Sequence, residues 1–79
     1  IKRMYLNGNN LTSFNPTTGV PSSLQYLGLA NNSISASSWN TNTAWINSAP
    51  NNAEIHSNNS IIGTTTFSLL TSKGWTITI

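Results

Sequence analysis

The feature that most constrains the fold of this chain is an internal repeat with a spacing of 23 residues. Residues 1–11 carry large apolar side chains at their first, fourth, sixth and eleventh positions and an asparagine at the ninth. Residues 24–34 carry the same residue classes at the same five positions. Agreement at five positions in one register predicts two successive copies of a single structural unit. The matching pairs are Ile1 and Leu24, Met4 and Leu27, Leu6 and Leu29, Asn9 and Asn32, and Leu11 and Ile34.

Each unit predicts a short strand followed by a turn. Side chains alternate between the two faces of a strand, so positions 4 and 6 should point into the core, while positions 3, 5 and 7 face solvent. Leu11 and Ile34 would close the core after the turn. The asparagines at position 9 lie where the chain leaves the strand, where an amide can bond otherwise unpaired backbone groups.

A third, degenerate unit follows at residues 53–58, with Ile55 at position 6 and Asn58 at position 9. This alignment puts Ile55 over Leu6 and Leu29 in adjoining units. It also predicts a ladder of stacked asparagines, formed by Asn9, Asn32 and Asn58.

The two clear units fit the pattern LxxLxLxxNxL, so the chain resembles the leucine-rich repeat family. The lead-in at residues 21–24, Pro-Ser-Ser-Leu, is similar to bacterial members. The resemblance implies an α/β solenoid with a short parallel sheet on its concave side and irregular, 3₁₀ and short helical segments on its convex side. We expect one domain fragment over residues 1–79. It would comprise repeat 1 (1–23), repeat 2 (24–49), a degenerate repeat 3 (50–63) and a C-terminal helix–strand cap (64–79).

The segments between the strands predict different structures. Two prolines in residues 14–21 argue against a helix there, and Phe14 should plug the convex side. Residues 37–47 predict a short helix that ends near Pro50. In the cap, Thr64–Thr66 can begin a helix and Gly74 can follow its end. The side chains expected to point inward from these segments and the final strand are Trp39, Trp45, Ile46, Trp75, Ile77 and Ile79.

Composition excludes several classes of function. Charged residues make up 5% of the chain, against roughly 25% in an average domain, and Asn, Ser and Thr account for 36 of its 79 residues. Lys2 and Arg3 are too few to bind nucleic acid through its phosphates. No apolar run approaches the roughly 20 residues that cross a bilayer. With no Cys and one His, we expect no metal site and no cofactor.

An enzyme is the least favoured class. Glu54 and His56 share one face of a strand and could be written as an acid–base pair. However, glycoside hydrolysis usually needs two carboxylates, and no serine lies in a nucleophile motif. A polar strand face is the better interpretation of these two residues.

The concave face is the better candidate for a site. The register assigns to it Arg3, Tyr5, Asn7, Tyr26, Glu54 and His56 as partner-binding residues, and also Gly28, Ala30, Thr76 and Thr78 as neutral surface. Tyrosine and arginine are favoured anchors in interfaces, and tyrosine rings can stack on sugars. In the family that the chain resembles, partners typically bind on this surface.

The leading hypothesis is therefore a non-enzymatic module that binds a protein or a glycan on its concave sheet. The alternative is a structural subunit of a phage virion, fibre or surface filament. Nothing in the pattern covers the edge of the first strand, so we expect upstream repeats or another subunit there. Ice binding by a threonine array is weaker, since only Thr76 and Thr78 have the required spacing. The absence of Cys fits a bacterial, viral or cytosolic origin better than an animal extracellular repeat domain, which often carries disulfide-bonded caps. For the leading hypotheses we expect a bacterial or phage protein located outside the cell, on its surface or in a virion.

Overall fold

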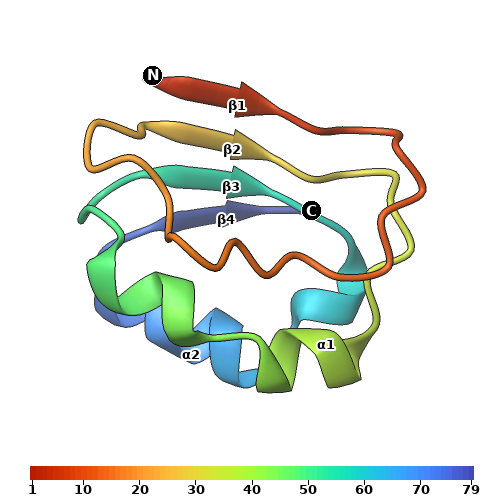
Figure 1. Ribbon diagram of the computed structural model, residues 1–79. Coiled ribbons are helices and arrows are strands. Elements are labelled where there is room, and N and C mark those ends of the chain that lie inside the picture. The colour runs from red at the N-terminus through yellow and green to blue at the C-terminus, as the bar shows by residue number, and fades with distance from the viewer.

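Four short strands form one parallel sheet, in the order in which they occur along the chain. The computed structural model describes residues 1–79. Each of the first three strands is followed by a return segment that contains either irregular structure or short helices (Figure 1). The elements are β1 (Arg3–Tyr5), β2 (Tyr26–Gly28), α1 (Ala36–Thr41), the 3₁₀ helix η1 (Ala44–Ser48), β3 (Glu54–His56), the 3₁₀ helix η2 (Asn59–Ile61), α2 (Thr65–Ser72) and β4 (Thr76–Thr78).

Both α-helices lie on the same side of the sheet, and the opposite face is bare (Figure 1). We call each strand with its return segment a unit: unit 1 is residues 3–25, unit 2 is residues 26–53 and unit 3 is residues 54–75. The helix of unit 3, α2, packs against α1 of unit 2, so the units are stacked in sequence order. This arrangement is a small α/β fold with a four-stranded parallel sheet. None of its helices could cross a membrane, since the longest, α2, has 8 residues.

The strand register confirms the pairing of the first two units and corrects the third. Met4 pairs with Leu27, as the 23-residue spacing predicts. Ile55, however, pairs with Leu27 and with Ile77, and so does not lie over Leu29. The sequence alignment of the third unit is therefore wrong by two positions. Tyr26 and Glu54, which pair, are separated by 28 residues, because α1 and η1 lengthen the return segment of unit 2.

The core lies between the sheet and the return segments. Phe14, Trp39, Trp45 and Trp75 are all buried in it, as predicted. Ile79 is 49% exposed, contrary to expectation, because it lies beyond the last residue of β4 and nothing packs over it. The remaining buried apolar side chains of this core are Val20, Leu24, Leu27, Leu29, Ile34, Ile46, Ala49, Ala53, Ile55, Ile61 and Leu70.

The helices begin and end where local chemistry dictates. The hydroxyl of Thr64 accepts a hydrogen bond from the backbone N–H of Phe67, which confirms the predicted N-cap of α2. Gly74 follows the helix with φ of 78°, the left-handed conformation expected at that position. The predicted helix over residues 37–47 is instead two short helices, α1 and η1, separated by Asn42 and Thr43.

Candidate binding face

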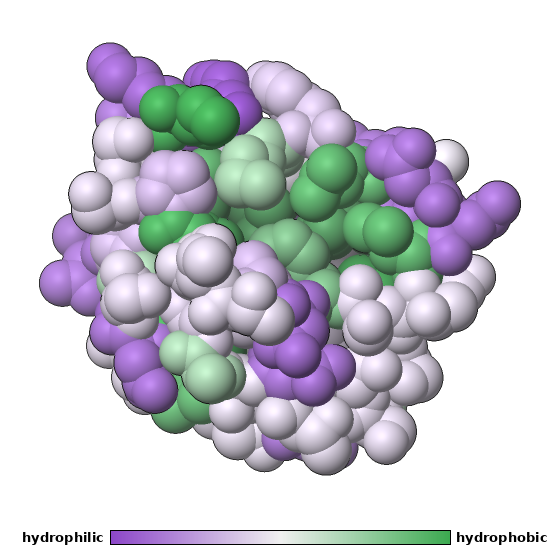
Figure 2. Space-filling view, viewed as in Figure 1, coloured by the Kyte–Doolittle hydropathy of each residue, from purple (hydrophilic) through white to green (hydrophobic).

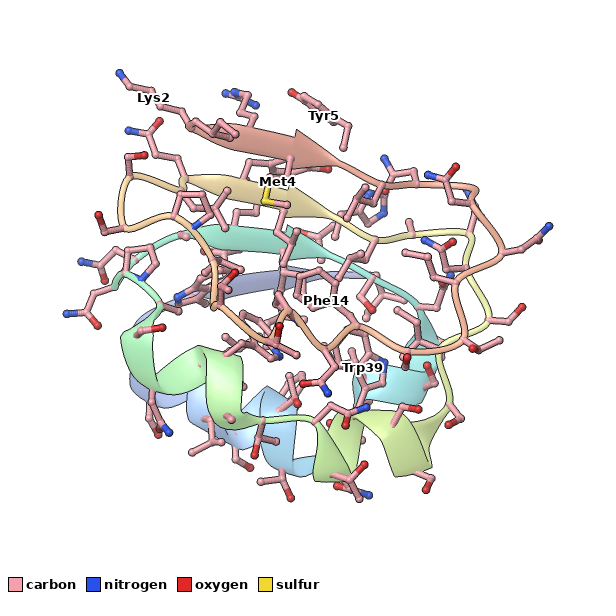
Figure 3. The ribbon with its side chains drawn as sticks, viewed as in Figure 1. Lys2, Met4, Tyr5, Phe14 and Trp39 are labelled. Atoms are coloured by element: carbon pink, nitrogen blue, oxygen red, sulfur yellow. The ribbon has the colours of Figure 1, made fainter.

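The strand register arranges the candidate side chains in rows across the bare face of the sheet. Arg3, Tyr26 and Glu54 form one row, which Thr76 completes. Tyr5 begins the next row, which continues through Gly28, His56 and Thr78. Neighbouring strands lie about 4.8 Å apart, so side chains within a row are in reach of one another. Figure 3 shows the ring of Tyr5 directed away from the core and Met4 directed into it.

Three side chains at the β1 end of this face form a cluster, which we call the tyrosine cluster: Arg3, Tyr5 and Tyr26. The two rings have their centroids 5.4 Å apart and are tilted by 42°. The guanidinium carbon of Arg3 lies 5.7 Å from the centre of the Tyr26 ring, and Nη1 of Arg3 donates to the Tyr5 hydroxyl at 3.3 Å. Tyr5 is 62% exposed. A cationic and aromatic surface is thus already assembled and open to solvent.

Gly28 makes room for this cluster. A Cβ atom at Gly28 would lie 2.9 Å from Oδ1 of Asn7 and 3.2 Å from the ring of Tyr26. The space above Gly28 is therefore filled by these two neighbouring side chains. From the sequence Gly28 was expected to be neutral surface, and this role was not predicted. The signal was a glycine inside a strand, which often marks a close approach by another group.

Asn7 lies at the end of the same face but is held by the backbone. Its Oδ1 accepts a hydrogen bond from the N–H of Ala30 at 2.9 Å. Ala30, expected on the solvent side, is buried. The side chain of Asn7 is therefore held in place by a backbone hydrogen bond, and its oxygen is already occupied before a partner binds.

Glu54 and His56 lie on the bare face, as predicted, and both are half-buried. The hydroxyl of Thr78 donates to Oε2 of Glu54 at 3.4 Å. The side chains of Glu54 and His56 form no hydrogen bond with each other. No group of three or more histidine, cysteine or acidic side chains comes together to offer metal ligands.

The three asparagines of the predicted ladder are connected by hydrogen bonds. Oδ1 of Asn32 accepts from the backbone N–H of Asn9 at 2.9 Å, and Oδ1 of Asn58 accepts from the N–H of Asn32 at 3.4 Å. The side chain of Asn9 is exposed and donates only to the carbonyl of Asn7. The side chains of Asn32 and Asn58 each join two units, whereas that of Asn9 bonds only within unit 1.

A depression of about 410 Å³ on the return side was not identified from the sequence. It lies between the turn after Phe14 and η1. Trp45, its one aromatic lining residue, is 2% exposed, so its ring offers little surface to a ligand. The lining residues are Asn15, Pro16, Thr17, Thr18, Gly19, Ala44, Trp45 and Ser48.

In comparisons with known proteins, no family model, no curated protein and no solved structure matches this chain. The chemistry of its bare sheet face therefore has to be interpreted from its own residues.

Proposed function

We propose that this chain is a non-enzymatic interaction module of the leucine-rich-repeat type, a solenoid that binds a protein or glycan partner on the bare face of its sheet. The observation that carries the proposal is the tyrosine cluster, which is assembled before any partner arrives. An interface residue that is already ordered loses little side-chain entropy on binding. The in-order parallel strands and the shared positions of Met4 and Leu27 support the repeat assignment.

The composition of the face supports binding by contact area and hydrogen bonds over binding by charge. Tyrosine and arginine dominate the residues that carry most of the binding energy in protein interfaces. Exposed aromatic rings also provide flat surfaces against which a sugar can stack. Glu54 and His56 extend the face beyond the cluster and would contribute polar contacts at its far side.

The test compares Tyr5→Ala with Tyr26→Ala, made together, against a matched control of Thr76→Ala with Thr78→Ala. All four residues lie on the bare face, but the control pair lies on β4, away from the cluster. The probes are an array of defined oligosaccharides and a displayed library of random peptides. The tyrosine variant should lose at least about 30-fold in affinity for any selected binder, while the threonine variant keeps it.

Far-UV circular dichroism of both variants shows whether they remain folded. A binder whose affinity is the same for wild type and the folded tyrosine variant would contradict the proposal. A binder that is lost only in the threonine variant would place the contact on β4 and would contradict the cluster as its anchor.

A further inference from the structure

The two ends of the stacked units expose the apolar side chains that the middle of the stack buries. Leu27, Leu29 and Ile34 of unit 2 are 0%, 1% and 6% exposed. Their counterparts in unit 1, Met4, Leu6 and Leu11, are only partly buried. Within residues 1–79, no segment covers unit 1 in the way that unit 1 covers unit 2. One more strand with its return segment, packed against unit 1, would bury these side chains.

The uncovered surface is visible on the face turned to the viewer in Figure 2. Apolar side chains gather there between β1 and the return segment that follows it. Met4 reaches into this area, and Phe14 lies below it (Figure 3). Ile1, 76% exposed, adds to the same end of the molecule. A contiguous apolar area of this kind marks an interaction surface in a soluble domain.

The opposite end of the stack also exposes large apolar side chains. In unit 3, Ile61 and Leu70 face the core, while the neighbouring Ile62 and Leu69 are 57% and 37% exposed. Ile79, beyond β4, is also exposed. Together with Ile1 and Tyr5, these residues are the large exposed hydrophobic side chains of the chain. Apart from Tyr5 of the bare face, all of them belong to the first or last segments of the stack.

The backbone at both sheet edges is also ready to pair. The carbonyl of Lys2 and the N–H of Leu6 are directed toward β2, so the backbone groups of Arg3 and Tyr5 point to the open edge. At the other edge, the N–H of Thr76 donates to the carbonyl of Ala53 and the carbonyl of Thr78 accepts from the N–H of Ser57, which leaves the backbone groups of Ile77 pointing outward. Both edges are parallel strands of equal length that run in the same direction.

We propose that these two ends bind each other in head-to-tail fashion, so that the last segment of one copy covers unit 1 of the next. β4 would pair with β1 of the following copy, which continues the parallel sheet. A contact between different surfaces of identical chains leaves a free end on each side and so generates open filaments. With three cations and one anion, the chain has little charge to oppose such stacking.

The area of the two end surfaces determines the expected affinity of head-to-tail association. The molecule measures 26 × 23 × 22 Å along its principal axes. Stacking would cover about 500 Å² on each copy, near the lower limit for specific interfaces. Association should therefore be weak and concentration-dependent, and backbone pairing at the sheet edges would fix its geometry. This inference is independent of partner binding on the bare face.

The experiment uses three variants, each with two added lysines. Ile1→Lys with Leu11→Lys blocks the first end, and Ile62→Lys with Leu69→Lys blocks the last end. Thr41→Lys with Asn47→Lys changes the exposed side of unit 2 and is the matched control. Light scattering would measure the mass of each protein between about 10 μM and about 1 mM, the range expected for an interface of this size.

Wild type and the control variant should gain mass with concentration, and each end-blocked variant alone should stay monomeric. The two end-blocked variants mixed in equal amounts should form a dimer, because each has one free end of the opposite kind. If the variant with both Ile1→Lys and Leu11→Lys does not fold, Ile1→Lys alone blocks the first end, since the side chain of Ile1 is exposed. Wild type that stays monomeric throughout this range would overturn the proposal. End-blocked variants that associate alone, or whose mixture fails to dimerise, would overturn it as well.

Discussion

Oδ1 of Asn32 accepts a hydrogen bond from the backbone N–H of Leu11, in the preceding unit, at 3.0 Å. The same oxygen accepts from Asn9, and Nδ2 of Asn32 donates to the carbonyls of Leu6 and Leu29. One side chain thus satisfies backbone groups in two successive units, in the turns that follow their strands. The half-buried position of Asn32 keeps water from replacing these bonds easily.

Asn32→Ala should therefore lower the free energy of unfolding by about 3 kcal/mol, since it leaves several backbone groups without partners. Asn9→Ala is the matched control, because Asn9 has the same repeat position but an exposed side chain with a single long bond. Its effect should stay within about 0.5 kcal/mol. Urea unfolding measures both. If Asn32→Ala does not fold, Asn32→Asp preserves the acceptor and should show an intermediate loss. Equal effects for Asn9 and Asn32 would show that the cross-unit bonds contribute nothing.

Thr66 provides a second test of contact between units. Its side chain is fully buried, and its hydroxyl donates to the carbonyl of Trp39 at the end of α1. Thr66→Val keeps the volume and removes the donor, so the free energy of unfolding should fall by about 1–2 kcal/mol. Thr71→Val removes an exposed hydroxyl from the same helix and should change stability by less than about 0.5 kcal/mol. Thermal unfolding that ranks the two variants in the opposite order would contradict the assigned bond.

Gly28→Ala tests how the bare face is organised. The added methyl group would collide with the amide of Asn7 and approach the Tyr26 ring. Both side chains must move, so nuclear Overhauser contacts between the rings of Tyr5 and Tyr26 should weaken. The amide of Ala30 should also exchange faster with solvent, because Asn7 Oδ1 no longer accepts from it.

Gly8→Ala is the control for the glycine change itself. Gly8 has φ of 70° and open space around it, so alanine there adds backbone strain of about 1 kcal/mol without a collision. The contacts between the tyrosine rings should survive in this variant. Rings that stay together in Gly28→Ala would show that the glycine does not set the spacing of the cluster.

Lys73 contributes through its amine at the end of α2. Nζ donates to the carbonyl of Ala49 at 2.6 Å and, more weakly, to that of Asn47. These carbonyls belong to the end of η1, so the amine ties unit 3 to unit 2. Lys73→Met should cost about 1–2 kcal/mol of unfolding free energy, because it removes a charged donor and keeps the apolar stem. Lys2→Met, on an exposed side chain without such bonds, should be neutral in the same chemical-denaturation measurement.

The site could be predicted from the sequence where the repeat is regular, and not where it is degenerate. Arg3, Tyr5 and Tyr26 follow from alternation along two strands with a constant spacing, and their shared face was predicted correctly. Ile55 was misplaced because it is the one large apolar side chain within residues 53–58, so two alignments satisfied the pattern equally well. The length of the helical return segment in unit 2 decided between them. Local pattern does not encode that length, since α1 and η1 form against the core of neighbouring units.

The sequence by itself determined the inward positions of Met4 and Leu27 and the caps of α2 at Thr64 and Gly74. These depend on side-chain alternation and on hydrogen bonds between residues close in the chain. The tertiary structure decided that Asn32 carries the cross-unit bonds while Asn9 does not, and that Gly28 holds space for Tyr26. Both outcomes depend on which unit lies beside each residue. Asn32 has unit 1 next to it, whereas the outer side of unit 1 carries no neighbour for Asn9 to bond.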